Sequence, residues 1–433
     1  MTLPVGKYLA RHGLSGPWSI ERANNRDWRN AVVIPALAER DSLFLTLDSL
    51  ATNPRELLAQ TLALVVVNQR VDATAADRQD NLATLDSLQC YAASTPLQLG
   101  WVDAATPGKE LPEDRGGVGM ARKIGFDLVL HQVAAHPDGF IASLDADTLV
   151  RPDYLPALET HFSRTPAGAA TIPYCHQAAG EPAQQIAIDS YELFLRHYVL
   201  GLMLAGSPYA YHSIGSSLAF SPQAYLKAGG MNLRQAGEDF YLLQQLQKTS
   251  GVRQLGGTVV YPSARLSART PFGTGERVAR QLQGEGSAVE FYAAGCFRIL
   301  AAWLQLLSNN LDASGEQLLQ QFTTSSPEAC RFLQNNNFLA AWQRLQQNHP
   351  QPQQRLGAFH GWFDALRTLR LIHHLSATSA PRCAAEPALT PLLHWAGWPT
   401  VDKPAAQLVL LRSKQTGEDA PEAHCPLPSQ PRL

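Results

Sequence analysis

The stretch IASLDADTLVRPDYL, residues 141–155, decides which fold is expected for this 433-residue chain. Its apolar start predicts a buried strand, and Pro152 is well placed in the first turn of a following helix. Asp145 and Asp147 come between them, and side chains at positions i and i+2 can point to the same side. Two like charges repel, and a divalent cation that prefers oxygen ligands, Mg2+ or Mn2+, resolves the repulsion. The alternative is that Asp147 caps the next turn and Asp145 is simply exposed.

Two further apolar runs predict buried strands earlier in the chain. Residues 30–35 (NAVVIP) end at a proline, and residues 62–67 (LALVVV) end at Asn68. A helix is expected between them over residues 43–50, and buried strands that alternate with helices indicate a parallel α/β sheet. Ligands bind at the carboxyl edge of such sheets, so Asn68 and the aspartate pair are expected on the same edge.

The predicted secondary structure changes from mixed strands and helices to helices alone near residue 284. Before it, strands are predicted over 214–220 and 258–261, with a helix over 238–248 and a polar, glycine-rich loop over 104–119 that enters a helix over 120–133. After it, apolar residues follow helical spacing only. The expected organisation is an α/β domain over 1–283, an all-helical portion over 284–412 and a polar, proline-rich, disordered tail over 413–433.

Composition excludes several classes of protein. A net charge of -2 argues against a broad basic face for nucleic acid. Six scattered cysteines without a CxxC pair predict neither a disulfide framework nor a structural zinc site, and favour a reducing compartment. The start of the chain lacks a signal-peptide pattern, and no apolar run reaches the roughly 18 residues of a membrane span. A cytoplasmic protein without a transmembrane segment is therefore expected.

Three segments occur in the order and spacing of a known family. They are VVIPALAERDSLFLTLDSL (32–50), SLDADTLVRPDYL (143–155) and AGGMNLRQAGEDFYLLQQL (228–246). Over residues 30–280 the sequence resembles the inverting family 2 glycosyltransferases, which use nucleotide-diphosphate sugars. The resemblance implies a GT-A type fold, in which helices flank a Rossmann-like mixed sheet.

The resemblance also implies roles for two acidic pairs. Asp145 and Asp147 match the metal and diphosphate motif. Glu238 and Asp239 match the segment with the catalytic base, and the family's pair usually assigns the base to its second acid, here Asp239. A carboxylate suits that role because it must take a proton from the acceptor hydroxyl. Without this context, Glu238 and Asp239 would be interpreted as acids that stabilise a helix N-terminus.

The donor side of the expected site draws on several segments. Pro35 and Glu39 belong to the VIPAxxE pattern of the nucleotide-binding edge. The second strand usually ends in acidic residues, but here it ends in Asn68, so Asp103 is expected to supply the missing carboxylate. All four residues are predicted to bind the nucleotide-sugar donor.

Basic residues are expected beside the diphosphate. Arg122 and Lys123 follow the glycine-rich helix start, and Arg265 and Arg269 precede FGTG (272–275). Guanidinium groups pair well with diphosphate oxygens. A solvated hairpin with ordinary surface arginines is the alternative for the last two.

Small residues mark the expected acceptor side. Gly215 and Ser216 would let a sugar approach the backbone, and His212 could reach the acceptor or the metal. Residues 117–119 (GVG) resemble the start of a dinucleotide fingerprint, but no strand leads into them, so a dehydrogenase is not expected.

The sequence therefore predicts a hexosyltransferase-type enzyme that needs Mg2+ or Mn2+. It would move a sugar, with inversion, from a nucleotide-diphosphate sugar to a hydroxyl of a carbohydrate or lipid-linked acceptor, the latter through peripheral contact with the inner face of a membrane. Two alternatives stay open: a non-catalytic scaffold on a transferase fold, and a sugar nucleotidyltransferase. The intact acidic pairs argue against the first, and the poor match of ALAERDS to a basic, glycine-rich loop argues against the second.

Overall fold

The computed structural model describes residues 5–22, 28–234, 237–265 and 289–417. The chain divides into two compact units. The first comprises Met1–Gln185, Ser213–Glu276 and Ser413–Leu433, and the second comprises Ile186–His212 and Arg277–Arg412. Most of one long helix, α7 (Pro182–Leu204), thus belongs to the second unit, although it precedes the C-terminal helices by about a hundred residues in sequence.

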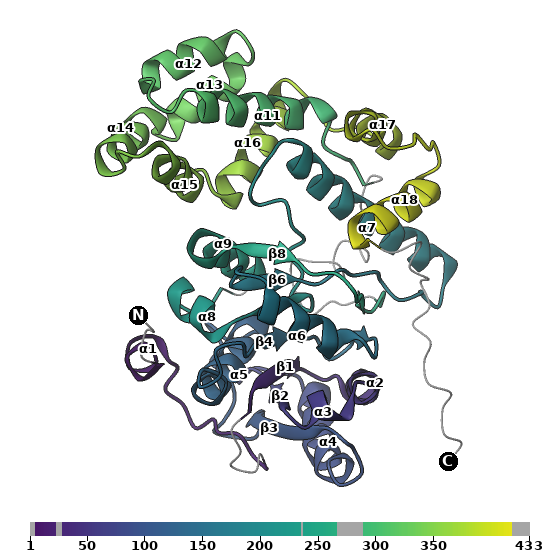
Figure 1. The fold of residues 1–433 in the computed structure, drawn as a ribbon. Coiled ribbons are helices and arrows are strands. Elements are labelled where there is room, and N and C mark those ends of the chain that lie inside the picture. Colours follow the sequence, from purple (N-terminus) through teal and green to yellow (C-terminus); the bar gives the residue numbers. More distant parts are fainter. Residues whose placement is uncertain (1–4, 23–27, 235–236, 266–288, 418–433) are drawn as a thin grey trace. The chain divides into compact units, whose positions relative to one another are not determined.

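A seven-stranded mixed sheet forms the centre of the first unit (Figure 1). The strand order is β3-β2-β1-β4-β7-β6-β8, and β7 runs antiparallel to both of its neighbours. The strands are β1 (Asn30–Ala36), β2 (Thr61–Asn68), β3 (Gln98–Ala104), β4 (Ile141–Ser143), β6 (Ala169–Thr171), β7 (Leu218–Phe220) and β8 (Val252–Gln254). Every residue of β1 and β2 is buried, which is why their sequences are continuously apolar. The predicted class, a mixed α/β sheet with helices and a helical C-terminal portion, is confirmed.

Helices lie on both sides of this sheet (Figure 1). They are α1 (Val5–His12), α2 (Arg40–Ala51), α3 (Arg55–Leu58), α4 (Ala75–Tyr91), α5 (Val118–Val133), α6 (Tyr154–Arg164), α8 (Pro222–Ala228) and α9 (Glu238–Ser250). The helix α5 packs on β1 and β2. It comes so close that a Cβ added at Gly125 would lie 2.3 Å from Val33 Cγ1.

Three predicted boundaries are corrected by the structure. Pro152 lies in a turn, and α6 begins at Tyr154. Of the strand expected over 214–220, only Leu218–Phe220 forms, because the Ser217 amide closes a turn by donating to the Ile214 carbonyl (3.0 Å). The last predicted strand, β9 (Val260–Tyr261), pairs with β5 (Leu149–Val150) in a separate antiparallel sheet.

The second unit consists of helices around an aromatic core. Besides α7 they are α11 (Ala294–Asn309), α12 (Gly315–Thr323), α13 (Pro327–Asn335), α14 (Phe338–Asn348), α15 (Pro352–Trp362), α16 (Ala365–Thr378), α17 (Ala385–Ala396) and α18 (Pro404–Thr416). Trp303 lies at the centre of this core, with its ring against those of Phe322 and Phe338. Residues 413–416, predicted to begin the tail, continue α18, and residues 418–433 lie outside the described part. No helix among the described residues is long and apolar enough to cross a membrane.

The tight contact at Gly125 yields a stability prediction. Gly125→Ala is expected to lower the free energy of unfolding by about 1–3 kcal/mol, because the added methyl group would force α5 away from Val33. Urea denaturation followed by circular dichroism measures this change. Gly357→Ala is the control: it lies in an exposed helix turn with no atom within 4 Å of an added Cβ. Equal loss in both variants would contradict the prediction.

Candidate active site

The loop after β4 holds two carboxylates at the carboxyl edge of the sheet. Its backbone forms a turn in which the Thr148 amide donates to the Asp145 carbonyl (3.1 Å). The Thr46 hydroxyl of α2 donates to the Ala146 carbonyl (2.9 Å), and the Gln177 side-chain amide donates to the Asp147 carbonyl (2.9 Å). Because β1 pairs in parallel with both β2 and β4, this loop lies at the same edge as the end of β2, as predicted.

Arg265 connects this loop to the start of α2. Its Nη2 forms an ion pair with Glu39 and another with Asp147 (2.9 Å), and its Nη1 donates to the Ser42 hydroxyl (3.3 Å). The antiparallel pairing of β5 and β9 brings the two chain segments together. Three residues predicted on the donor side, Glu39, Asp147 and Arg265, are thus neighbours.

Arg122 makes the second connection, between the Asp145 loop and the start of α9. It projects from α5, its side chain is only 4% exposed, and its two terminal nitrogens pair with Asp145 Oδ1 and Glu238 Oε1. Glycines make room for it: a Cβ at Gly215 would lie 2.1 Å from Arg122 Nη2, and a Cβ at Gly119 would lie 3.0 Å from Glu238 Cγ. The predicted metal motif and the predicted base segment therefore meet through one guanidinium group.

Glu238 and Asp239 begin α9 but differ in their surroundings. Glu238 is buried and held by Arg122. Asp239 is half-buried, and its Oδ1 accepts a hydrogen bond from the Phe240 amide (2.7 Å). Among the described residues, no side chain donates to the Asp239 carboxylate. Of the two acids, Asp239 is thus the more exposed and the more accessible to a substrate.

Among the described residues, carboxylates outnumber cations at this edge. Five carboxylates (Glu39, Asp145, Asp147, Glu238 and Asp239) lie near two described guanidinium groups, those of Arg122 and Arg265. Burial, together with the neighbouring charges of Asp145 and Glu39, raises the pKa of Asp147 to about 7 against the opposing effect of Arg265. Burial and then Glu238 likewise raise the pKa of Asp239.

This donor set suits Mg2+ or Mn2+. The groups are hard carboxylate oxygens that carry uncompensated charge, and such ions commonly take only one or two carboxylates from the protein. Among the described residues, no three His, Cys, Asp or Glu side chains are placed to hold a metal ion by themselves. Asp145 and Asp147 would therefore hold the ion together with phosphate oxygens and water.

Three other residues predicted on the donor side belong to the backbone of the sheet edge or form hydrogen bonds with it. Pro35 is a buried part of β1. The Asn68 side-chain amide donates to the Ala36 carbonyl (3.0 Å). Burial opposes the ionisation of Asp103, but hydrogen bonds from Thr106 and its neighbours lower the pKa of this acid below its usual value. Asn68 and Asp103 thus shape the edge by tying down its backbone and loops.

Lys123 does not join the site, which corrects the prediction for it. Its ammonium group pairs with Asp127 (2.9 Å) and donates to the Tyr8 hydroxyl (3.1 Å). Tyr8 and Tyr225 both donate to Asp127 Oδ1 (3.1 and 2.9 Å), so this buried network joins α1 and α8 to α5. Lys123 therefore anchors α5, whereas its neighbour Arg122 enters the site.

The predicted acceptor residues are only partly brought to the site. Gly215 contacts Arg122 as described above. Ser216 is fully buried, so its hydroxyl is not open to a substrate in this structure. His212 is buried and belongs to the second unit. Arg269 lies outside the described residues.

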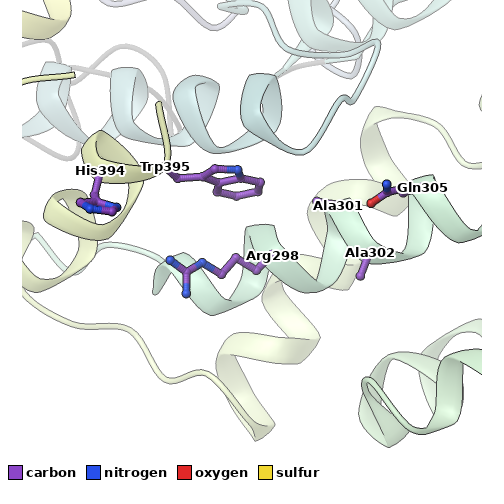
Figure 2. A pocket seen from close by; sticks show the side chains of 6 residues that line it. All are labelled: Arg298, Ala301, Ala302, Gln305, His394 and Trp395. Carbon is purple, nitrogen blue, oxygen red and sulfur yellow. The ribbon is translucent and has the colours of Figure 1, made fainter. Parts of the chain in front are cut away.

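The second unit contains a separate shallow cavity of about 400 Å³ between α11 and α17 (Figure 2). On one side α11 contributes side chains at helical spacing, and on the other α17 contributes an imidazole and an indole. The lining residues are Arg298, Ala301, Ala302, Gln305, His394 and Trp395. None of them is a carboxylate, so this cavity offers no carboxylate base.

Comparisons with known proteins give similarity only to solved structures. No family model matches the chain. No curated protein matches it either. The crystal structure of S. aureus TarS 1-349 is 13% identical and covers 81% of this chain and 91% of its own, with a TM-score of 0.36. A mannosyltransferase from Pyrobaculum calidifontis, PcManGT, in complex with GDP-Man and Mn2+, is 15% identical and covers 95% and 92%, with a TM-score of 0.35. These values are low, so function is inferred from the site's own residues.

The raised pKa of Asp147 predicts a pH-dependent gain of stability on its removal. An acid with a pKa near 4 in the unfolded chain and about 7 in the folded chain binds more protons when folded. Stability therefore falls as the pH rises through this window. In the metal-free protein, Asp147→Asn is expected to raise the unfolding temperature at pH 8 by about 2–5 °C, and by much less at pH 5.

Differential scanning fluorimetry at the two pH values measures this effect. Asp153→Asn is the matched control, because it removes a carboxylate from the same segment that pairs with Arg151 (2.6 Å) and lies outside the acidic group. The control is not expected to stabilise the protein. The same gain at pH 5 and pH 8 for Asp147→Asn would be inconsistent with a raised pKa.

Proposed function

We propose that the protein is a glycosyltransferase of the hexosyltransferase type. It uses Mg2+ or Mn2+ and moves a sugar from a nucleotide-diphosphate sugar to a hydroxyl acceptor with inversion. The observation that carries this proposal is the convergence of Asp145, Asp147 and Asp239 at one sheet edge, beside the guanidinium groups of Arg122 and Arg265. Asp239 is about 90 residues from the Asp145 and Asp147 pair in sequence. Clusters of acids with perturbed pKa values are typical of functional sites.

The donor diphosphate is expected to lie beside the Asp145 loop. Asp145 and Asp147 are the ligands for the divalent ion, which when bound would neutralise the charge that develops on the departing nucleoside diphosphate. Arg265 is partly exposed beside Asp147, where its guanidinium group can reach diphosphate oxygens. Glu39, next to the start of α2, pairs with Arg265 and adds a further carboxylate to the donor side.

Asp239 is assigned as the general base. The acceptor oxygen attacks the anomeric carbon while its proton passes to the Asp239 carboxylate, and the bond from the anomeric carbon to the diphosphate oxygen breaks. A raised pKa makes this carboxylate a stronger base, which favours proton transfer near neutral pH. Glu238 is held by Arg122 and is assigned a positioning role. One displacement without a covalent intermediate inverts the anomeric centre.

The acceptor is proposed to be a carbohydrate or a lipid-linked compound. A lipid-linked acceptor would bring the protein into peripheral contact with the inner face of the membrane.

Nucleotide binding tests the donor site directly. Isothermal titration with UDP and with GDP, each with and without Mn2+, is expected to show binding that requires the metal and favours one base. Asp145→Ala and Asp147→Ala are expected to weaken the metal-dependent binding at least tenfold, because each removes a ligand oxygen. Asp153→Asn should bind like the unchanged protein. Metal-independent binding, or none, would overturn the proposal.

The base assignment has its own test. Asp239→Asn is expected to lower the turnover of the preferred sugar nucleotide about 10²- to 10⁴-fold, while the Kd for the nucleoside diphosphate with Mn2+ changes less than twofold. Turnover is measured as release of nucleoside diphosphate; release of pyrophosphate would indicate a nucleotidyltransferase instead. An unchanged turnover rate in Asp239→Asn would show that Asp239 is not the general base.

A further inference from the structure

Arg265 and Arg122 both neutralise the acidic group, but their surroundings differ. The Arg122 side chain is 4% exposed, and each of its two terminal nitrogens pairs with an acid. It cannot move away without leaving the buried carboxylate of Glu238 unpaired. The Arg265 side chain is 33% exposed. It can therefore exchange its partners through water.

Arg265 lies where a metal ion would bind. Its Nη2 is 2.9 Å from Asp147 Oδ2 and also pairs with Glu39. Under the proposed function, Asp147 is a metal ligand, and a guanidinium group on its carboxylate competes for the same oxygen lone pairs. A second electrostatic partner for Arg265 would be the diphosphate of the donor, because guanidinium groups bind phosphate oxygens in a forked geometry.

We propose that Arg265 is an internal counter-cation that couples metal binding to nucleotide binding. Without ligands it neutralises Asp147 and Glu39 and opposes entry of a divalent ion. When a nucleoside diphosphate arrives, Arg265 transfers to the phosphates and releases Asp147 for the metal. Metal and nucleotide then strengthen each other's binding by the same factor, as reciprocal coupling requires. This inference rests on the proposed function.

The direction in which the Mn2+ affinity changes when Arg265 is replaced distinguishes this role from a simple phosphate contact. A residue that only contacts phosphate would leave Mn2+ binding unchanged in the absence of nucleotide. A counter-cation that pairs with Asp147 would weaken Mn2+ binding in the absence of nucleotide. Arg265→Gln is therefore expected to bind Mn2+ alone about 3- to 10-fold more tightly. The same variant should bind the nucleoside diphosphate more weakly in the presence of Mn2+. The factor by which nucleotide improves Mn2+ affinity should shrink accordingly.

The experiment measures Mn2+ affinity by the loss of the free-ion electron paramagnetic resonance signal, with and without UDP or GDP. Arg151→Gln is the matched control, since Arg151 pairs with Asp153 in the same loop and is similarly exposed. It should leave both affinities unchanged. Circular dichroism verifies folding, and Arg265→Lys, which keeps the charge but loses the fork, provides a second variant with an intermediate effect.

The outcomes separate the two proposals. If the unchanged protein binds Mn2+ and nucleotide together but Arg265→Gln and Arg265→Lys bind Mn2+ alone no better, the counter-cation role is wrong and the proposed function stands. If the unchanged protein binds no Mn2+ with either nucleotide, the proposed function itself fails. Tighter Mn2+ binding by Arg265→Gln with a reduced nucleotide effect supports the inference.

Discussion

The buried guanidinium group of Arg122 is the interaction on which the candidate site depends. It joins Asp145, beyond the end of β4, to Glu238, at the start of α9. A buried ion pair is weak evidence for stability, but a pair that loses one partner leaves a charge that water cannot reach. Arg122 and Glu238 are both buried and therefore require each other, whereas Asp145 is partly exposed. A side chain at position 215 would require the guanidinium group to shift, since an added Cβ would lie 2.1 Å from Arg122 Nη2.

The excess of carboxylates around Arg122 works against stability in the metal-free protein. Burial and mutual repulsion raise the pKa values of both Asp147 and Asp239, so each of them resists ionisation at neutral pH. A divalent cation would relieve this repulsion and favour the ionised carboxylates. Residues kept in an unfavourable state are more often found at functional sites than in ordinary ion-pair networks. This reasoning favours a transferase over a scaffold with a decayed site, in which neutral replacements would have relieved the repulsion.

Much of the fold and of the acidic group could be predicted from the sequence, because strand ends and helix starts are local features. Continuous apolar runs in β1 and β2 reveal burial on both faces, and parallel pairing then places Asn68 and Asp145 on one edge. The direction in which a helical side chain points is harder to predict from the sequence. Consecutive residues of a helix point about 100° apart, so Lys123 faces Asp127 while Arg122 faces the site. Gln177 and Ser42 were missed because neither has a local signal. Their roles arise from β5 and β9 pairing across a long stretch of chain.

The two arginines show why residue type alone does not determine a role in such a site. Both are basic residues beside a predicted diphosphate-binding loop, and the motif assigns both to the phosphates. Arg122 lies beneath the acids, on a helix that is itself anchored by the network of Lys123, Asp127 and Tyr8, and so belongs to the framework. Arg265 lies at the solvent side of the same acids, where an incoming ligand can replace its partners. The difference in exposure, 4% for the Arg122 side chain and 33% for that of Arg265, is therefore the reason for proposing a fixed structural role for the first and an exchangeable one for the second.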